Sequence, residues 1–286
     1  MVDRIVTSTR DRRDAILDVI RGAERRLFLS LFRCNDDGLF DELERAVARG
    51  VKVEVLTTAR DKGSRRRLEK LWSALARTGA TVHKYADPVV KYHAKYLVAD
   101  EGPAVVASLN FTRKCFSRTW DAVVVTHDPD VVSGLQRLLE ADRDGLPLPD
   151  PLTPRLIVGP ERARRQLTAL ITQARESIRL IDAKLSDPDL LTLLHARRAS
   201  GVRVEIVAAK QVGELKSHGK IMLIDGRTAV VGSLALAAIS LEFRREVAIT
   251  VEEREAVAEI EQLFNALPVA TGVDRPSADR RGEALC

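Results

Sequence analysis

The amino-acid sequence predicts an α/β protein of two similar halves, each a mixed sheet flanked by helices, related by a pseudo-twofold axis. Short β-branched apolar runs alternate with stretches of helical periodicity, which is typical of α/β units with buried strands. The segment 50–56, Gly-Val-Lys-Val-Glu-Val-Leu, returns at 201–207 as Gly-Val-Arg-Val-Glu-Ile-Val. The segment 93–100 likewise returns at 218–225. Self-similarity at such long spacing indicates a duplicated unit.

The elements around these segments also match between the halves. We expect helices at 14–26, 39–49, 162–175 and 190–200, and strands at 27–31 and 177–181. The spacing between the copies falls from 151 positions (50 to 201) to 125 positions (93 to 218). The second half is therefore expected to lack a segment that the first half has at about 64–85, with a helix at 68–77 and a strand at 81–84.

A proline-rich segment separates the halves. Four prolines fall within the eight positions 147–154, and proline cannot donate a backbone hydrogen bond within a helix or a central strand. Sequence beyond about residue 267 shows no periodicity. The expected organisation is a first half at 1–143, a linker at 144–154, a second half at 155–267 and a flexible tail at 268–286.

Composition and charge restrict the class of protein. Hydrophobic residues make up 45% of the 286 residues and charged residues 30%, as in a soluble globular protein. The longest apolar runs are shorter than the roughly 18 residues needed to span a bilayer, and no secretory signal is visible. Three cysteines without metal-type spacing suggest free thiols in a reducing compartment. We therefore expect a cytoplasmic protein, and its net charge of +5 suits a phosphate-bearing partner.

One motif occurs once in each half: His-x-Lys, four residues, Asp, six residues, then a small residue and Ser. Alternate residues of a strand share a face, so each His projects beside its Lys. A neutral imidazole is a nucleophile and proton carrier, and an adjacent ammonium binds phosphate oxygens and lowers the imidazole pKa. The motif residues are His93, Lys95 and Asp100 in the first half and His218, Lys220 and Asp225 in the second.

This duplicated motif resembles the signature of the phospholipase D superfamily, His-x-Lys-x4-Asp-x6-Gly-Ser-x-Asn, and the resemblance extends from about residue 10 to 265. It implies a metal-independent phosphodiesterase that needs no cofactor. One histidine would form a phosphohistidine, and the other would protonate the leaving alcohol and then activate the incoming water or alcohol. In the order common in the family, His93 is the nucleophile and His218 the general acid and base.

The resemblance also assigns roles to further residues. Lys95 and Lys220 would hold the phosphate, together with the phosphate-binding residues Ser108, Asn110 and Ser233. Asp121 and Glu246 each follow the histidine of their own half by 28 residues. They look like the carboxylates that orient His93 and His218 respectively. Asp100 and Asp225 are expected to have a structural role at the end of the strand.

The sequence departs from the family pattern at two positions. Ala107 stands in the place of glycine in the first half, and Ala235 stands in the place of asparagine in the second. Loss of an asparagine removes one hydrogen-bond donor from the phosphate site, which elsewhere costs about 10² to 10³ in rate. We therefore expect an active but asymmetric site, in which the first half keeps Asn110 and an Asp partner.

The sequence leaves the substrate open. Two motifs in one chain fit a monomeric enzyme of phospholipase D or cardiolipin synthase type, which favours a phospholipid and peripheral contact with the membrane. The basic charge is compatible with an endonuclease, and a non-catalytic phosphate-binding homologue is a third possibility. Arg33 and Lys184 are aligned cations that could attract an anionic substrate, whereas the run 65–67 of three arginines is interpreted as a solvated helix start.

Overall fold

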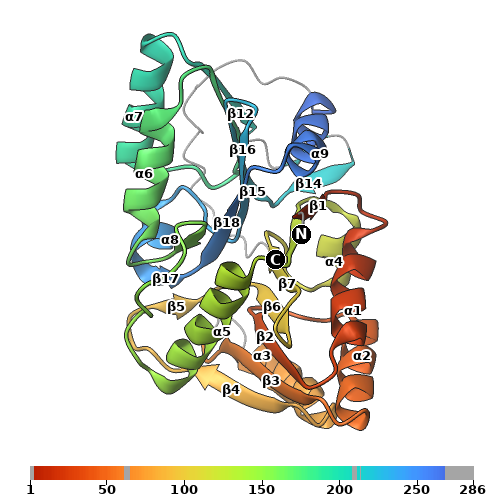
Figure 1. The fold of residues 1–286 in the computed structure, drawn as a ribbon. Coiled ribbons are helices and arrows are strands. Elements are labelled where there is room, and N and C mark those ends of the chain that lie inside the picture. Colours follow the sequence, from red (N-terminus) through yellow and green to blue (C-terminus); the bar gives the residue numbers. More distant parts are fainter. Residues whose placement is uncertain (1–2, 61–64, 208–210, 213, 268–286) are drawn as a thin grey trace.

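The computed structural model describes residues 3–60, 65–207, 211–212 and 214–267. Two large sheets form the centre of the molecule, one in each half, and helices flank both (Figure 1). The expected α/β class with two related halves is confirmed. The predicted tail at 268–286 lies outside the described residues, and the predicted boundaries of the halves stay a prediction.

The first half contains a seven-stranded mixed sheet. Its strands, in spatial order, are β1 (Arg4–Val6), β9 (Val123–Thr126), β7 (Ala104–Ala107), β6 (Tyr96–Ala99), β2 (Arg26–Leu31), β3 (Lys52–Thr58) and β4 (Thr81–Tyr85). Strands β2, β3 and β4 are parallel, and the other neighbours are antiparallel. Helices α1 (Arg12–Gly22), α2 (Asp37–Ala48), α3 (Arg65–Arg77), α4 (Arg113–Ser117) and α5 (Pro129–Asp144) belong to this half.

The second half repeats this order with six strands. They are β10 (Leu156–Val158), β18 (Val247–Val251), β16 (Thr228–Gly232), β15 (Lys220–Ile224), β11 (Ser177–Ile181) and β12 (Arg203–Val207). The helices are α6 (Ala163–Gln173), α7 (Pro188–Ala199), α8 (Ala238–Phe243) and α9 (Arg254–Asn265). Among the described residues of this half, no element corresponds to α3 or β4, which agrees with the shorter spacing of the second motif.

The same local chemistry begins an equivalent helix in each half. Asp36 precedes α2 and accepts a hydrogen bond from the Leu39 N–H, and Asp187 precedes α7 and accepts one from the Leu190 N–H. An arginine of the preceding helix binds each capping carboxylate: Arg13 holds Asp36, and Arg164 holds Asp187. Side-chain caps of this kind satisfy backbone donors that a helix leaves unpaired.

The two halves share one hydrophobic core. A single cluster of buried side chains joins Tyr92 and Leu138 of the first half to Ile221 and Val231 of the second. Separate clusters lie under the outer helices of each half. An ion cluster also crosses between the halves, because buried Arg245 lies 2.8 Å from Asp142 of α5 and 2.6 Å from Glu161. The pKa of Arg245 is raised, because these carboxylates outweigh the opposing effect of its burial.

Two small sheets connect the halves directly. β5 (Lys91–Tyr92) pairs in parallel with β17 (Arg244–Arg245), and β14 (Leu215–Ser217) pairs in parallel with β8 (Thr119–Trp120). β13 (Gln211–Val212) adds a further strand to β14. In each pair, a strand just before a motif histidine lies beside a strand just before a carboxylate of the other half. This pairing determines the geometry of the site.

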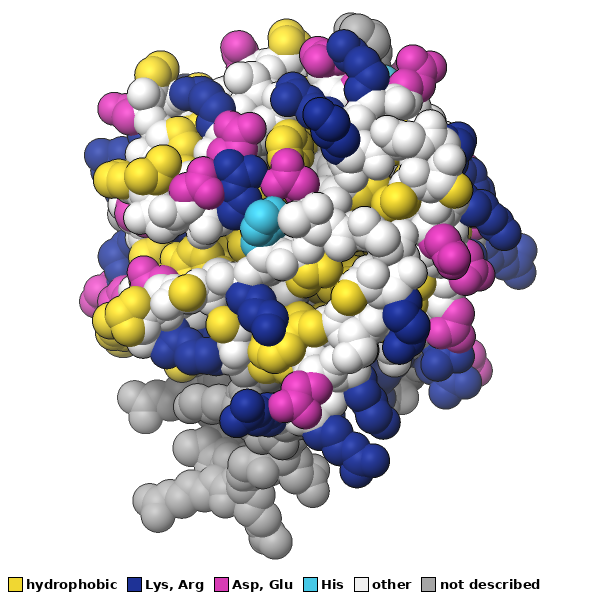
Figure 2. All heavy atoms as spheres, turned by 90° about the horizontal axis from the view of Figure 1, so that it is seen from below, with side chains coloured by type: hydrophobic (Ala, Val, Ile, Leu, Met, Phe, Trp, Pro, Cys, Tyr) yellow, Lys and Arg dark blue, Asp and Glu magenta, His cyan; other side chains and the backbone are white. Residues whose placement is uncertain are grey.

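Figure 2 shows the molecule from below, onto the first half. Basic side chains occur over all of this face, but acidic and hydrophobic side chains separate them. The positive charges on this face therefore do not form one continuous basic surface.

Candidate active site

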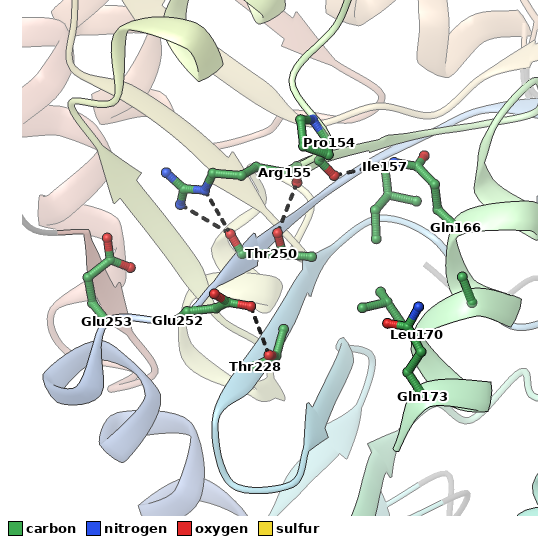
Figure 3. Close-up of a pocket in the computed structure, with 11 residues that line it drawn as sticks. Pro154, Arg155, Ile157, Gln166, Leu170, Gln173, Thr228, Thr250, Glu252 and Glu253 are labelled. Atoms are coloured by element: carbon green, nitrogen blue, oxygen red, sulfur yellow. Dashed lines mark hydrogen bonds between the residues drawn. The ribbon is translucent and has the colours of Figure 1, made fainter. Parts of the chain in front are cut away.

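A pocket of about 540 Å³ opens on the second half, where α6 faces β10 and β18 (Figure 3). Its lining includes Arg155, Gln166, Thr250 and Glu252, and no residue of the repeated motif. The Arg155 guanidinium is already engaged, because it donates to the Thr250 carbonyl and to Asp128. This pocket is therefore not the candidate active site.

The repeated motifs meet where the two small sheets join the halves. The His93 N–H donates to the Arg245 carbonyl at 2.9 Å, and the Gly219 N–H donates to the Trp120 carbonyl at 2.7 Å. A side chain at 219 would place its Cβ 2.5 Å from that carbonyl oxygen, so the close approach requires glycine. The residue after each of these carbonyls is a carboxylate, Glu246 or Asp121. The backbone thus brings each motif histidine next to the carboxylate of the other half.

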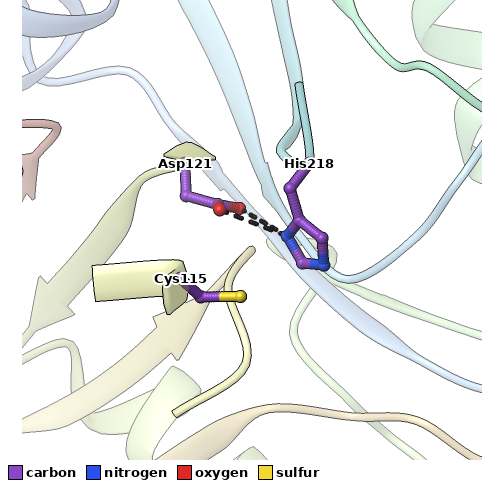
Figure 4. Close-up of side chains that lie close together, drawn as sticks. All are labelled: Cys115, Asp121 and His218. Atoms are coloured by element: carbon purple, nitrogen blue, oxygen red, sulfur yellow. Dashed lines mark hydrogen bonds and ion pairs between the residues drawn. The ribbon is translucent and has the colours of Figure 1, made fainter. Parts of the chain in front are cut away.

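The histidine–carboxylate pairs are formed crosswise. His93 Nδ1 lies 2.5 Å from Glu246 Oε1, and His218 Nδ1 lies 3.1 Å from both oxygens of Asp121 (Figure 4). The sequence-based pairing of Asp121 with His93 and of Glu246 with His218 is therefore wrong. The equal 28-residue spacing is real, but strands β5–β17 and β8–β14 exchange the partners between the halves.

Asp121 is held by a dense set of donors. Its oxygens accept hydrogen bonds from the hydroxyls of Ser108 and Thr119, each at 2.6 Å. The buried guanidinium of Arg12 binds the carbonyls of Phe116, Asp121 and Thr119. Burial acts to raise the pKa of Asp121, but His218, Arg12 and Ser108 outweigh it and lower that pKa to about 2. Asp121 is therefore ionised throughout the physiological range.

Glu246 has a different environment. Ser240 donates its hydroxyl to Glu246 Oε2, and Arg244 Nη1 lies 3.7 Å from Oε1. Burial raises the pKa of Glu246, and the charges of Lys95 and Arg244 offset only part of this effect. The carboxylate beside His93 thus holds its negative charge less firmly than the one beside His218.

Burial and positive charge lower the pKa of both histidines. The pKa of His93 is well below its ordinary value, first because the ring is buried and then because of Lys95 and Arg244. Lys95 Nζ lies 3.0 Å from His93 Nδ1 and donates to the His93 carbonyl at 2.6 Å. Burial also lowers the pKa of His218, although Asp121 opposes this shift. Lys220 donates in the same way to the His218 carbonyl.

The remaining predicted phosphate ligands differ in what they contact. Asn110 Nδ2 lies 3.5 Å from His218 Nε2, so its side chain reaches the ring nitrogen that Asp121 leaves unbound. Ser108 gives its hydroxyl hydrogen to Asp121, and the Ser233 hydroxyl is bonded to the backbone of Val247. Direct phosphate binding by these serines stays a prediction, whereas support of the carboxylate by Ser108 is visible.

Comparison with known proteins identifies the family. A family model described as "Cardiolipin synthase, PLD-like domain" matches residues 16–143 and 207–267, about two thirds of the chain. The chain belongs to this family. The expected membership of the phospholipase D superfamily is thereby confirmed.

Individual relatives are more distant. Cardiolipin synthase A of Pseudomonas aeruginosa is 29% identical over 129 residues, which is 44% of this chain but only 26% of that protein. The chain therefore spans about a quarter of the curated relative it matches. Phosphatidylserine synthase of Haemophilus influenzae has a TM-score of 0.74 at 12% identity, over 93% of this chain and 87% of its own. Polyphosphate kinase of Porphyromonas gingivalis has a TM-score of 0.72 at 19% identity. The likeness covers 92% of this chain and 50% of that protein's chain. These two likenesses show the fold alone.

The motif aspartates of this PLD-like chain lie at equivalent turns in the two halves. Asp100 and Asp225 adopt positive φ angles of 47° and 52° at the turns after β6 and β15. Asp100 accepts the N–H groups of residues 24, 25 and 26, and Asp225 those of residues 175, 176 and 177. Partial burial opposes the shift, but these backbone bonds lower the pKa of both carboxylates. Each aspartate thus ties its turn to the start of a central strand.

Sequence reasoning missed several residues that surround the histidines. They are Arg12, Phe32, Thr119, Ser240 and Arg244. Ser240 and Arg244 are equivalent by spacing to Cys115 and Thr119, so the repeat itself gave no signal for them. Lys184 was suggested as an aligned cation, and its charge does contribute to the low pKa of His93. Arg33 instead lines a neighbouring pocket.

Cys115 lies close to the His218–Asp121 pair (Figure 4). Its sulfur, a carboxylate oxygen of Asp121 and a ring nitrogen of His218 all lie within 4.8 Å of one another, a combination that can bind a metal ion. Cysteine spacing alone did not predict this cluster. The oxygens of Asp121 already accept two hydroxyl groups and the His218 ring, so hydrogen bonding accounts for the arrangement.

Proposed function

We propose that this chain is a metal-independent phosphodiesterase that hydrolyses or transfers phosphatidyl groups of phospholipids through a phosphohistidine. The observation that carries the proposal is the pair of histidines, one buried and one partly buried, each bound at Nδ1 by a carboxylate from the opposite half. A carboxylate at Nδ1 fixes the tautomer and leaves Nε2 for chemistry. Lys95 and Lys220 stand beside these rings and are suited to hold the phosphoryl oxygens.

In the first step, His93 Nε2 attacks phosphorus while the bond from phosphorus to the alcohol oxygen breaks. His218 enters this step as the imidazolium, with Asp121 bound at its Nδ1–H, and its Nε2–H gives its proton to that oxygen. In the second step, His218 Nε2 takes a proton from water or another alcohol, the new oxygen bonds to phosphorus, and the His93–phosphorus bond breaks. Atoms and protons balance over the two steps without any further reactant.

The two carboxylates support this assignment of roles. A nucleophile must be unprotonated, and burial together with neighbouring cations gives His93 a pKa well below its ordinary value. A proton carrier must be stable as an imidazolium for part of the cycle. Asp121, with its pKa of about 2, remains ionised and is able to stabilise the imidazolium of His218.

A phospholipid substrate is supported by the names of two relatives and by the surface near the site. The relatives are named cardiolipin synthase A and phosphatidylserine synthase. Large exposed hydrophobic side chains flank the β5–β17 pair: Val89 is 64% exposed, Ile239 51% and Phe243 47%. Apolar side chains beside a catalytic site suit peripheral contact with a bilayer. Within the described residues, no helix has the length and apolar character that crossing a membrane would require.

The test is an assay in EDTA on two substrates. We expect the protein to release nitrophenol from phosphatidyl-p-nitrophenol in mixed micelles and to leave plasmid DNA intact. Quenching the reaction without acid should trap the phosphohistidine intermediate on the wild-type protein. The intermediate should be absent in His93→Ala. Plasmid nicking without lipid turnover would make the protein a nuclease instead. A protein that cuts neither substrate and forms no phosphohistidine would be a phosphate-binding homologue.

A further inference from the structure

A second pocket, of about 520 Å³, adjoins the catalytic histidines. Two of its lining residues also contact those histidines. The Phe32 ring lies 4.5 Å from the ring of His93, and the Asn110 amide nitrogen lies 3.5 Å from His218 Nε2. Phe32 and Asn110 thus lie between the pocket and the candidate active site. Its lining comprises Phe32, Arg33, Cys34, Asn35, Asp37, Phe40, Arg67, Leu68, Lys70, Leu71, Ala74, Asn110, Thr112, Arg113 and Lys114.

Basic side chains dominate the polar part of this pocket. Of the described residues that line it, five are basic (Arg33, Arg67, Lys70, Arg113 and Lys114) and one is acidic (Asp37). The pocket in Figure 3 has the opposite balance, because its lining has one basic residue, Arg155, and two acidic ones, Glu252 and Glu253. Apolar residues such as Leu68 and Leu71 are buried at the base, while Arg67 and Lys70 are exposed. Such a site combines an apolar surface with cations that suit an anion.

Helix α3 forms one wall of the pocket, and only the first half has this helix among the described residues. Leu68, Leu71 and Leu75 bury one face of α3. Arg67 and Lys70 are three positions apart, so they lie on the same side of the helix. The site is therefore asymmetric: the segment missing from the second half is the one that contributes these two cations.

We propose that this pocket binds a phosphate group carried by the alcohol that leaves or enters at His218. The proposal rests on the function proposed above, in which His218 Nε2 exchanges a proton with the alcohol oxygen. An alcohol at that atom lies next to Asn110, and Asn110 lines the same pocket as Arg67 and Lys70, so an alcohol that carries a phosphate could place it beside these two cations. Phosphate oxygens accept charge-assisted hydrogen bonds from arginine and lysine. The phosphate recognised in this way does not react.

The test compares two acceptors that differ by one phosphate, glycerol and glycerol 3-phosphate. Phosphatidyl-p-nitrophenol is the donor, because its leaving group carries no phosphate. We expect the wild type to transfer to glycerol 3-phosphate with the higher kcat/KM. In Arg67→Glu/Lys70→Glu, the ratio of the two kcat/KM values should fall by about tenfold or more. The matched control is Arg65→Glu/Arg66→Glu, which makes the same charge change on the same helix outside the pocket and should keep the wild-type ratio.

Each outcome decides the proposal. The proposal is overturned if the ratio of the two kcat/KM values falls equally in the control variant, or if it falls in neither variant. Phosphatidylglycerol vesicles are also tested as the acceptor. If their kcat/KM exceeds that of glycerol 3-phosphate and falls in Arg67→Glu/Lys70→Glu, the phosphate is that of a lipid headgroup. A response confined to glycerol 3-phosphate assigns the pocket to a free phosphorylated alcohol.

A second measurement separates this proposal from the proposed function. If no donor is turned over, the catalytic assignment fails, and calorimetric titration of glycerol 3-phosphate still tests the pocket. Binding should persist in Lys95→Met/Lys220→Met and in the control variant, and should weaken about tenfold or more in Arg67→Glu/Lys70→Glu. Equal binding by all of these proteins would overturn the proposal.

Discussion

The two halves have the same order of strands, but their histidines have different surroundings. Two hydroxyl groups and Arg12 surround Asp121, the partner of His218. One hydroxyl group and Arg244 contact Glu246, the partner of His93. The pKa of the first carboxylate is lowered and that of the second is raised. A repeated scaffold therefore does not make the two imidazoles chemically equivalent.

The largest expected effect comes from removing each histidine. His93→Ala and His218→Ala should each lower kcat for a phospholipid by about 10⁴-fold or more, because each removes a reacting group. The comparison becomes sharper with phosphatidyl-p-nitrophenol, whose leaving group needs little protonation. On this donor, His218→Ala should recover phosphoenzyme formation, seen as a burst of nitrophenol, whereas His93→Ala should not. A burst in His93→Ala alone would reverse the two roles.

Neutralising the carboxylates should cost about 10³-fold in kcat, because each one orients its imidazole. The pH profile distinguishes the two. Asp121 acts to raise the pKa of His218, so Asp121→Asn lowers that pKa further and leaves a smaller protonated fraction at any given pH. The alkaline limb of kcat should therefore move to lower pH in Asp121→Asn and stay in place in Glu246→Gln. Equal shifts in both variants would contradict the crosswise pairing.

The contact between the halves should contribute to stability through Arg245. Arg245→Met leaves Asp142 and Glu161 without their buried partner, which should lower the free energy of unfolding by about 3–5 kcal/mol. Urea titration followed by circular dichroism measures this change. The exposed Arg118 serves as a control, because Arg118→Met should change stability by no more than about 0.5 kcal/mol.

The smallest of these effects concerns the asparagine that only one half has. Asn110→Ala removes a donor beside His218 Nε2 and should lower kcat by about 10²-fold. Ala235→Gly, at the equivalent position of the second half, removes no donor and should leave turnover close to the wild type. Steady-state kinetics on one donor compares the two variants. Equal losses would mean that backbone packing, and not the amide, matters at these positions.

The sequence predicted the features that repeat and missed those that depend on contacts between the halves. The duplicated His-x-Lys segments and the missing segment near 64–85 could be recognised because they are local patterns. The exchange of Asp121 and Glu246 could not, because equal spacing in both halves is compatible with either pairing. Arg12 is missed for a related reason: its burial follows from carbonyls more than 100 positions away.

The arginine run at 65–67 illustrates a partial success. It was interpreted as a solvated helix start, and α3 does begin at Arg65. Which side of the helix each arginine occupies depends on how Leu68, Leu71 and Leu75 pack, and a charge run alone does not reveal that. Arg67 lines the pocket, whereas Arg65 and Arg66 do not, and this difference is visible only when the packing of the helix against the first half is known.

The crosswise strand pairs also have a consequence for biosynthesis. The ribosome releases residues 1–143 well before residue 246 has been made, so the nascent first half contains His93 without its carboxylate. The order is reversed for His218, because its partner Asp121 has already been synthesised when His218 leaves the ribosome. A chain cut between the halves would keep every motif residue on one fragment or the other, yet neither fragment would contain a complete histidine–carboxylate pair. Both histidine–carboxylate pairs are therefore complete only once β17 pairs with β5 and β14 pairs with β8.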